Sequence, residues 1–137
     1  LAPGQALLGA LLALALPLLT ERLRPERASL RRPLRAARLL LVVLVDIVLA
    51  NIEVARRILG PESVLRPRFV WLPLDIRDPY GIAALAGIIT LTPGTVSSDL
   101  SADRRYLLVH AFNCDDPAAL AASIKQRYER PLMEIFT

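Results

Sequence analysis

Hydrophobic residues form two continuous stretches near the start of the chain and alternate with polar residues further on. The second stretch lies in residues 34–59, which contain no Pro or Gly before Gly60-Pro61 and therefore predict one long helix. Residues 39–45 are apolar on every face, whereas later residues are apolar on one side only. At about 100° per residue, four charged residues fall within roughly 20° of one line: Arg35, Asp46, Glu53 and Arg57. The pattern indicates a helix mostly in lipid or protein, with a single polar stripe.

The first apolar stretch, residues 5–19, contains no charged residue and is shorter than the roughly 20 residues that cross a bilayer. It lacks the basic start and the small-residue cleavage site of a signal peptide. We therefore expect a membrane helix that ends near Pro17, or one that enters the bilayer only partway. Because the sequence begins with Leu1, we also expect further sequence before it, such as another apolar helix.

The net charge of +4 comes from one segment of the chain. Residues 20–38 hold seven arginines against two glutamates, beside apolar helices, as in a cytoplasmic loop of a membrane protein. Nucleic-acid binding would need basic residues interleaved with aromatic ones on a domain face, and every aromatic residue here lies after residue 68. We therefore expect a lipid bilayer, and no nucleic acid, among the partners.

Two rules conflict over the placement of the C-terminal half. If the Arg-rich loop is cytoplasmic and residues 34–59 cross the bilayer, everything after residue 63 lies outside. Yet that half has a single free cysteine, Cys114, and its start is marked by Arg56 and Arg57. We expect a multi-pass or partly inserted protein of the cell (inner) membrane with a cytoplasmic C-terminal domain. The long helix then lies in the interface or dips into the bilayer, with its polar stripe outward. The alternative is an Arg-rich loop held outside by partner subunits.

The polar residues of the long helix have two interpretations. Carboxylates within a membrane are costly, so they are candidates for a proton relay. They also fit a helix half outside the bilayer, or a stripe that contacts a partner. Glu53 and Arg57 are spaced to form an ion pair, whereas Asp46 has only the distant Arg35 and Arg38 as prospective partners. The candidate residues for partner contact or relay are Asp46, Asn51, Glu53 and Arg57.

Residues 64–137 read as a small α+β domain, and residues 1–63 as a membrane-associated helical part. Residues 68–76 alternate like a strand, and Pro73 implies an edge position. A helix over residues 80–90, capped by Asp78, and strands over residues 95–100 and 106–113 follow.

The last predicted helix has Asp115 or Asp116 as its cap, and Pro131 ends or kinks it. Residues 132–136 fit either a last strand or more helix. The predicted fold is a membrane α-helical N-terminal part followed by a βαββα domain of the ferredoxin-like or a related two-layer kind.

A tight turn is predicted between the first domain helix and the second strand. Pro followed by Gly fills the two central positions of a type II turn, whose third residue needs a positive φ. The turn residues are Thr92, Pro93, Gly94 and Thr95.

The chain carries no recognisable catalytic, cofactor-binding or metal-binding motif. His110 and Cys114 suggest a nucleophile pair, but four positions along a strand separate them by about 13 Å. Asp115-Asp116 reads better as a helix cap than as an acid/base pair. We therefore expect a protein that is not an enzyme and has no cofactor.

The sequence resembles the E subunit of the Mrp-type multisubunit cation/proton antiporters, also called MrpE, MnhE or PhaE. The most specific part is ITLTPGTVS at residues 89–97, followed by residues 106–111. Residues 50–55 (ANIEVA), and Tyr128-Glu129 ahead of residues 132–135 (LMEI), are also similar to that family. The likeness covers nearly the whole chain, although family members usually carry another apolar helix before the position of Leu1.

The resemblance implies an accessory subunit, needed for assembly or activity, in an inner-membrane complex with several sister subunits. Such a complex exchanges monovalent cations, Na⁺ or K⁺, for protons, and the family assigns ion translocation chiefly to the large sister subunits. The alternative from another class is a free-standing, membrane-tethered regulatory or ligand-binding domain. Co-purification with other membrane subunits separates the two.

Overall fold

The computed structural model describes residues 3–20, 32–60 and 66–136. Most of the Arg-rich loop, and residues 61–65 between the two predicted parts of the chain, therefore lie outside the described residues. The elements, in chain order, are α1 (Pro3–Thr20), α2 (Pro33–Ile58), β1 (Arg68–Pro73), α3 (Pro79–Leu91), β2 (Thr95–Leu100), β3 (Tyr106–Ala111), α4 (Pro117–Ile124), the π-helical turn η3 (Lys125–Glu129) and α5 (Arg130–Phe136).

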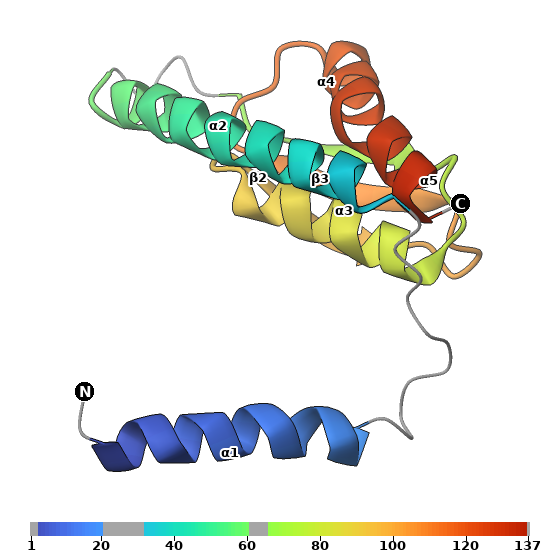
Figure 1. The fold of residues 1–137 in the computed structure, drawn as a ribbon. Coiled ribbons are helices and arrows are strands. Elements are labelled where there is room, and N and C mark those ends of the chain that lie inside the picture. Colours follow the sequence, from blue (N-terminus) through green and yellow to red (C-terminus); the bar gives the residue numbers. More distant parts are fainter. Residues whose placement is uncertain (1–2, 21–31, 61–65, 137) are drawn as a thin grey trace.

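Helix α1 lies apart from the other elements in both views of the fold (Figure 1). The expectation that this helix ends near Pro17 is wrong, because Pro17 lies inside it and the helix continues to Thr20. The exposed large hydrophobic side chains of α1 are leucines, from Leu7 to Leu19. Among the described helices, none is both long and apolar enough to span a bilayer, so the predicted membrane-helical part is not confirmed.

Helix α2 confirms the predicted long helix. It is 26 residues long, with Pro33 in its first turn, where a missing N–H costs nothing. Arg56 and Arg57 lie in its last turn, where positive charge favours the C-terminal end of the helix dipole.

The three strands form one antiparallel sheet in the order β1-β3-β2, so the order strand, helix, strand, strand, helix is as predicted. Strand β1 lies at an edge and ends at Pro73, as the proline requires, rather than extending to Ile76. Strand β3 ends at Ala111 rather than at residue 113. Residues 130–136 are helical, so the described chain lacks the last strand of a complete βαββαβ ferredoxin-like unit.

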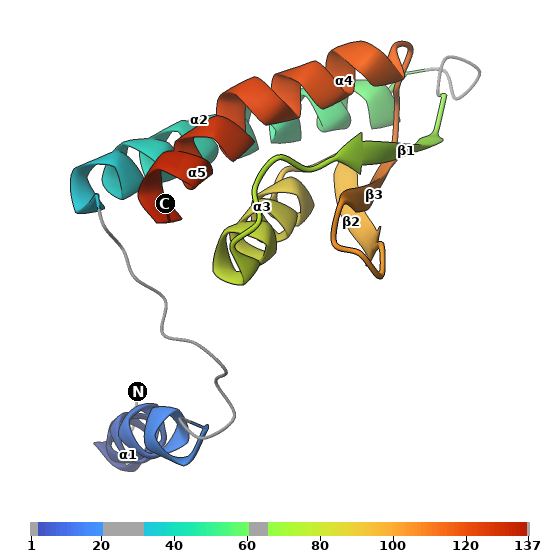
Figure 2. The same ribbon diagram turned by 90° about the vertical axis from the view of Figure 1, so that its right-hand side faces the viewer.

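The helices cover one face of the sheet, and the core lies between the two layers (Figure 2). Leu72, Leu107 and Val109 point from the sheet into this core. Leu85 and Ile89 of α3 meet them there, and the C-terminal helices add further side chains: Ile124, Tyr128, Leu132 and Ile135. The opposite face of the sheet exposes large side chains, including Phe69, Trp71, Val96 and Tyr106.

Helix α2 packs on the C-terminal helices and belongs to the same hydrophobic core (Figure 1). Leu39 and Val43 are 7% and 5% exposed and join the cluster that includes Leu132 and Ile135. Since Leu39 and Val43 precede residue 63 and the sheet follows it, the buried core draws on both predicted parts of the chain.

Side-chain caps fix the starts of the two domain helices. Asp78 accepts a hydrogen bond from the backbone N–H of Gly81 at 2.8 Å. Asp116, not Asp115, caps the last helix and accepts from the N–H groups of Ala118 and Ala119. These bonds satisfy backbone donors that a helix start otherwise leaves free.

The last helix runs to Phe136 and changes geometry in its middle. Lys125–Glu129 form a π-helical turn, in which the N–H of Arg130 bonds the carbonyl of Lys125. Pro131 follows at once, cannot donate a backbone hydrogen bond, and would collide with the carbonyl of Arg127 in a regular helix. The wider turn accommodates Pro131, so the helix neither ends nor breaks there.

The turn between α3 and β2 brings Gly94 against α2. Gly94 has φ of 92°, and the N–H of Thr95 bonds the carbonyl of Thr92 at 3.2 Å. A Cβ at Gly94 would lie 3.4 Å from Cγ2 of Val54. The Thr95 hydroxyl also donates to the carbonyl of Ile89 at 2.7 Å, which ties the turn to the end of α3.

We predict that Gly94→Val lowers the free energy of unfolding of the full chain by about 1–3 kcal/mol, because a β-branched residue is strained at positive φ. Chemical denaturation of the chain in detergent, followed by circular dichroism, measures the change. Gly87→Val is the matched control, because a Cβ at that exposed position of α3 meets no neighbouring element within 4 Å. Equal stability of the two variants would contradict the importance of the turn.

Candidate functional site

Asp46 of α2 lies at the contact with the C-terminal helices. Arg127 forms a two-point ion pair with its carboxylate: Nε donates a hydrogen bond to Oδ2 at 2.6 Å, and Nη2 donates to Oδ1. The Tyr128 hydroxyl donates to Oδ2 at 2.9 Å. Asp46 is 8% exposed, and both of its carboxylate oxygens have partners.

These contacts determine the charge state of the site. The hydrogen bond from Arg127 holds the pKa of the Asp46 carboxyl below its ordinary value of 3.8; burial opposes this, and Tyr128 reinforces it. Burial and the neighbouring carboxylate raise the pKa of the Tyr128 hydroxyl above its ordinary 10.0. At neutral pH, Asp46 is therefore a fixed negative charge, and Tyr128 is a neutral donor.

Two residues of the polar stripe of α2, Arg35 and Asp46, face the C-terminal helices, so the expectation that the stripe points outward is wrong for this part of the helix. Arg35, one end of the stripe, pairs with Glu134 of α5. Asp46 bonds Arg127, a partner 81 residues away that the spacing of charges along one helix cannot identify. The large side chains on the remaining surface of α2 are exposed: Leu40, Leu41, Leu44, Val45, Val48, Leu49 and Ile52.

The other candidate residues of α2 make local contacts. Nε and Nη2 of Arg57 donate to Oε1 of Glu53 at 3.0 and 2.6 Å, which is the ion pair that the spacing predicts. Asn51 is exposed, and its side-chain amide donates to the carbonyl of Ile47 within the same helix. Asn51 therefore does not join the contact at Asp46.

The π turn η3 supplies a second polar contact that the sequence analysis missed. Glu129 is 1% exposed, and its Oε1 accepts the N–H groups of Asp75 and Ile76 at 2.7 and 3.1 Å. Its Oε2 accepts from Nζ of Lys125 at 3.0 Å, and Lys125 also donates to the carbonyl of Pro73. Glu129 thus anchors the segment between β1 and α3 to the last helix.

The two residues that suggested a nucleophile pair, His110 and Cys114, have different surroundings, and only His110 lies on strand β3. The imidazole of His110 packs against the ring of Phe69, with centroids 4.8 Å apart. Cys114 is 5% exposed and packs with Val70 and Ala111. The part of the chain described by the structure contains no group of three or more His, Cys, Asp or Glu side chains placed to hold a metal ion.

The arrangement at Asp46 is suited to fixing α2 on the domain. A proton relay needs a carboxyl that gains and loses a proton near neutral pH, and Arg127 disfavours the protonated form. The two oxygens of Asp46 already accept three hydrogen bonds from Arg127 and Tyr128. The sequence signal that could have found this contact is the presence of Arg127 and Tyr128 side by side in the last amphipathic helix.

We predict that Asp46→Asn lowers the free energy of unfolding of the full chain by about 2 kcal/mol at neutral pH, because it breaks a charge-assisted, two-point pair whose carboxylate is buried. Folding lowers the Asp46 pKa, so this stabilisation is present above the ordinary value of 3.8 and is lost as the pH falls through the lower folded value. The difference between wild type and variant should therefore shrink in acid. Denaturation series at several pH values test both expectations.

Glu53→Gln is the control on the same helix, because its carboxylate is 64% exposed and its ion pair should contribute less than about 0.5 kcal/mol. The double variant Asp46→Asn/Arg127→Gln should lose less stability than the sum of its single changes, since the two residues share one interaction. An Asp46→Asn chain as stable as the Glu53→Gln chain would contradict the assignment.

Comparison with known proteins gives one consistent result. The chain matches the MNHE family, described as "Na+/H+ ion antiporter subunit", over residues 2–135. It is 31% identical over 129 residues to the E1 subunit of a Na(+)/H(+) antiporter of Staphylococcus saprophyticus, covering 94% of this chain and 81% of that protein. It is 32% identical over 90 residues to the E subunit of a Na(+)/H(+) antiporter of Alkalihalophilus pseudofirmus, covering 66% of this chain. That match spans only 57% of the Alkalihalophilus protein.

Two solved structures are similar in fold and sequence. A chain of the Mrp complex from Dietzia sp. has a TM-score of 0.55 and 28% identity, covering 72% of this chain and 94% of its own. A chain of the membrane-bound sulfane sulfur reductase, an archaeal respiratory membrane complex, has a TM-score of 0.73 and 27% identity, covering 99% of this chain and 87% of its own. Because the family match extends over nearly the whole sequence, this chain belongs to the Na⁺/H⁺ ion antiporter subunit family MNHE.

Proposed function

We propose that this protein is an accessory subunit of a multisubunit membrane complex that exchanges a monovalent cation, Na⁺ or K⁺, for protons. Its role is to support the assembly or activity of the complex through contacts with sister subunits. Family membership supports the antiporter assignment, and the relatives named above are subunits of such antiporters. One structural observation supports the accessory role: the Asp46 carboxylate is committed to Arg127 and Tyr128.

The exposed apolar side of α2 supports a place at the membrane. With its polar stripe turned toward the domain, α2 presents several leucines to its surroundings, among them Leu41 at 64% and Leu49 at 58% exposure. Exposed apolar patches of this kind mark membrane or protein contacts. We propose that residues 1–63 are membrane-associated, that α2 lies along the bilayer surface, and that residues 64–137 form the attached domain.

The open face of the sheet is a second surface suited to a sister subunit. Phe69 and Trp71 on β1 are 66% and 51% exposed, and Tyr106 on β3 is 46% exposed. Exposed aromatic residues on a rigid sheet are common in protein interfaces. Together with α2, this face gives the small domain apolar contact area on two sides.

We predict that Asp46→Asn lowers the yield of assembled complex but leaves cation-dependent proton flux per complex unchanged. The reason is that loss of the Arg127 contact loosens α2 on the domain without removing a group from the ion path. Affinity purification of the tagged chain with its sister subunits measures assembly, and proton uptake by reconstituted vesicles measures exchange. Glu53→Gln should change neither quantity.

Normal assembly combined with loss of cation-dependent proton flux in Asp46→Asn would instead make Asp46 a relay residue. The same purification tests the alternative of a free-standing, membrane-tethered regulatory or ligand-binding domain. A wild-type chain that purifies from native membranes without sister subunits, and that antiport does not require, would favour that alternative.

We propose that residues 64–137 lie in the cytoplasm. The Arg-rich segment of residues 20–38 and the basic end of α2, Arg56-Arg57, both favour the cytoplasmic side. Cys114 is a poor reporter of orientation because it is buried in the domain. Ala122→Cys in a Cys114→Ala background places a thiol on an exposed position of α4.

We predict that a membrane-impermeant maleimide labels this introduced thiol only after the cells are permeabilised. The physical reason is that, before permeabilisation, the intact inner membrane separates the reagent from the domain. The Cys114→Ala chain without the new thiol gives the background. Labelling from outside intact spheroplasts would contradict the proposed orientation.

A further inference from the structure

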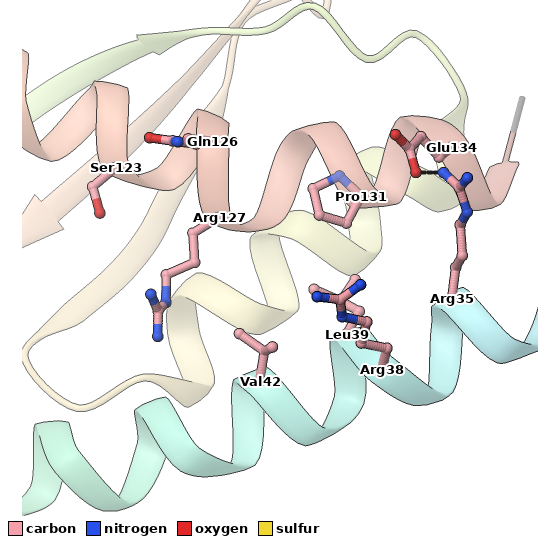
Figure 3. Close-up of a pocket in the computed structure, with 9 residues that line it drawn as sticks. All are labelled: Arg35, Arg38, Leu39, Val42, Ser123, Gln126, Arg127, Pro131 and Glu134. Atoms are coloured by element: carbon pink, nitrogen blue, oxygen red, sulfur yellow. Dashed lines mark ion pairs between the residues drawn. The ribbon is translucent and has the colours of Figure 1, made fainter.

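A cavity of about 680 Å³ lies between α2 and the C-terminal helices (Figure 3). Three arginines line it, two from α2 and one from the π turn: Arg35, Arg38 and Arg127. Ser123 and Gln126 contribute polar groups from the opposite side, and Leu39 forms part of an apolar floor. The cavity is large enough for a charged group of several heavy atoms together with the start of an aliphatic chain.

The charges of the cavity are not balanced. Arg35 pairs with Glu134 at one end, which Figure 3 draws as a dashed line. Arg127 forms an ion pair with Asp46, which does not itself line the cavity. Arg38 forms no ion pair with any residue in the part of the chain that the structure describes, so one full positive charge remains for a ligand.

The surroundings of Arg38 combine a cation with an apolar path. Leu41 and Val45 follow Arg38 by three and seven residues, so they lie on the same side of α2, and they are 64% and 49% exposed. An anion bound at Arg38 can therefore continue directly onto an apolar helix surface. A free inorganic anion would use only the first of these features, whereas a lipid uses both.

We propose that this cavity binds the phosphate group of an acidic phospholipid, with Arg38 as its principal ligand and the acyl chains against the exposed side of α2. Guanidinium groups bind phosphate oxygens through paired, charge-assisted hydrogen bonds. The Ser123 hydroxyl and the Gln126 amide are donors suited to the remaining oxygens or to a glycerol headgroup. The proposal rests on the proposed position of α2 at the membrane surface.

Native mass spectrometry of the full chain in detergent tests the proposal without any transport measurement, so its failure is distinct from failure of the antiporter assignment. The chain is titrated separately with phosphatidylglycerol, phosphatidylcholine and inorganic phosphate. Wild type should retain one phosphatidylglycerol in preference to phosphatidylcholine. Arg38→Gln should weaken phosphatidylglycerol binding about tenfold, which is the effect of losing one charge-assisted contact.

Two variants separate the site from general charge attraction. Arg56→Gln removes the same charge from an exposed position near the other end of α2 and should leave phosphatidylglycerol binding unchanged. Arg38→Lys keeps the charge but not the planar donor pair and should bind with intermediate strength. Circular dichroism confirms that each variant is folded.

Three results would overturn the proposal. Equal retention of the two lipids by wild type would remove the preference for an acidic headgroup. Equal losses in Arg38→Gln and Arg56→Gln would show general attraction rather than a site at the cavity. Inorganic phosphate binding that depends on Arg38, without a lipid preference, would assign the cavity to a free phosphate.

Discussion

The position of α2 depends on the contact between Asp46 and the pair Arg127-Tyr128. An apolar helix can pack against a domain in many rotations, because hydrophobic contact has no direction. A buried carboxylate removes that freedom, since any rotation that separates it from Arg127 leaves a charge without a partner in a poorly hydrated place. The same contact turns Leu41, Leu44 and their neighbours outward. The buried polar group therefore determines which apolar side of the helix is exposed.

The π turn connects this contact to the rest of the domain. Within five residues it presents Arg127 and Tyr128 to α2 and Glu129 to the segment after β1. Each of these polar side chains lies far along the sequence from its partner, at 81 residues for Arg127 and 54 for Glu129. A widened helical turn of this kind is uncommon and tends to occur where a helix carries functional contacts. Here it lets one short segment join α2, the sheet and the last helix.

This organisation suits a subunit that supports a larger assembly. Several carboxylates of the described residues are used in ion pairs or helix caps, as Asp46, Asp78 and Glu129 illustrate. The exposed side of α2 and the open face of the sheet are apolar instead. These two outer apolar surfaces are available for binding, and the buried carboxylates Asp46 and Glu129 are both paired, which is consistent with an accessory role in a membrane complex.

The sequence by itself determined the local elements of this protein. Pro33 at the start of α2, Asp78 and Asp116 as caps, Gly94 at a positive φ, and Pro73 at a sheet edge all act through backbone geometry within a few residues. The order of strands and helices in the domain follows from the same local signals. Family membership also follows from the sequence, because the family match extends over residues 2–135.

Only the tertiary structure decided the direction of the polar stripe and the partners of its charges. The periodicity of α2 places Arg35 and Asp46 on one line, but a line of charges on a helix looks the same whether it faces water or a folded domain. Arg127 and Glu134 come from a segment about eighty to a hundred residues later, and no rule of local spacing connects them to α2. The helical state of residues 130–136 was equally open, since Pro131 is tolerated only because the preceding turn widens. Contacts between distant segments depend on how the whole chain packs, and that is why the stripe was expected to face outward although Arg35 and Asp46 were found against the C-terminal helices.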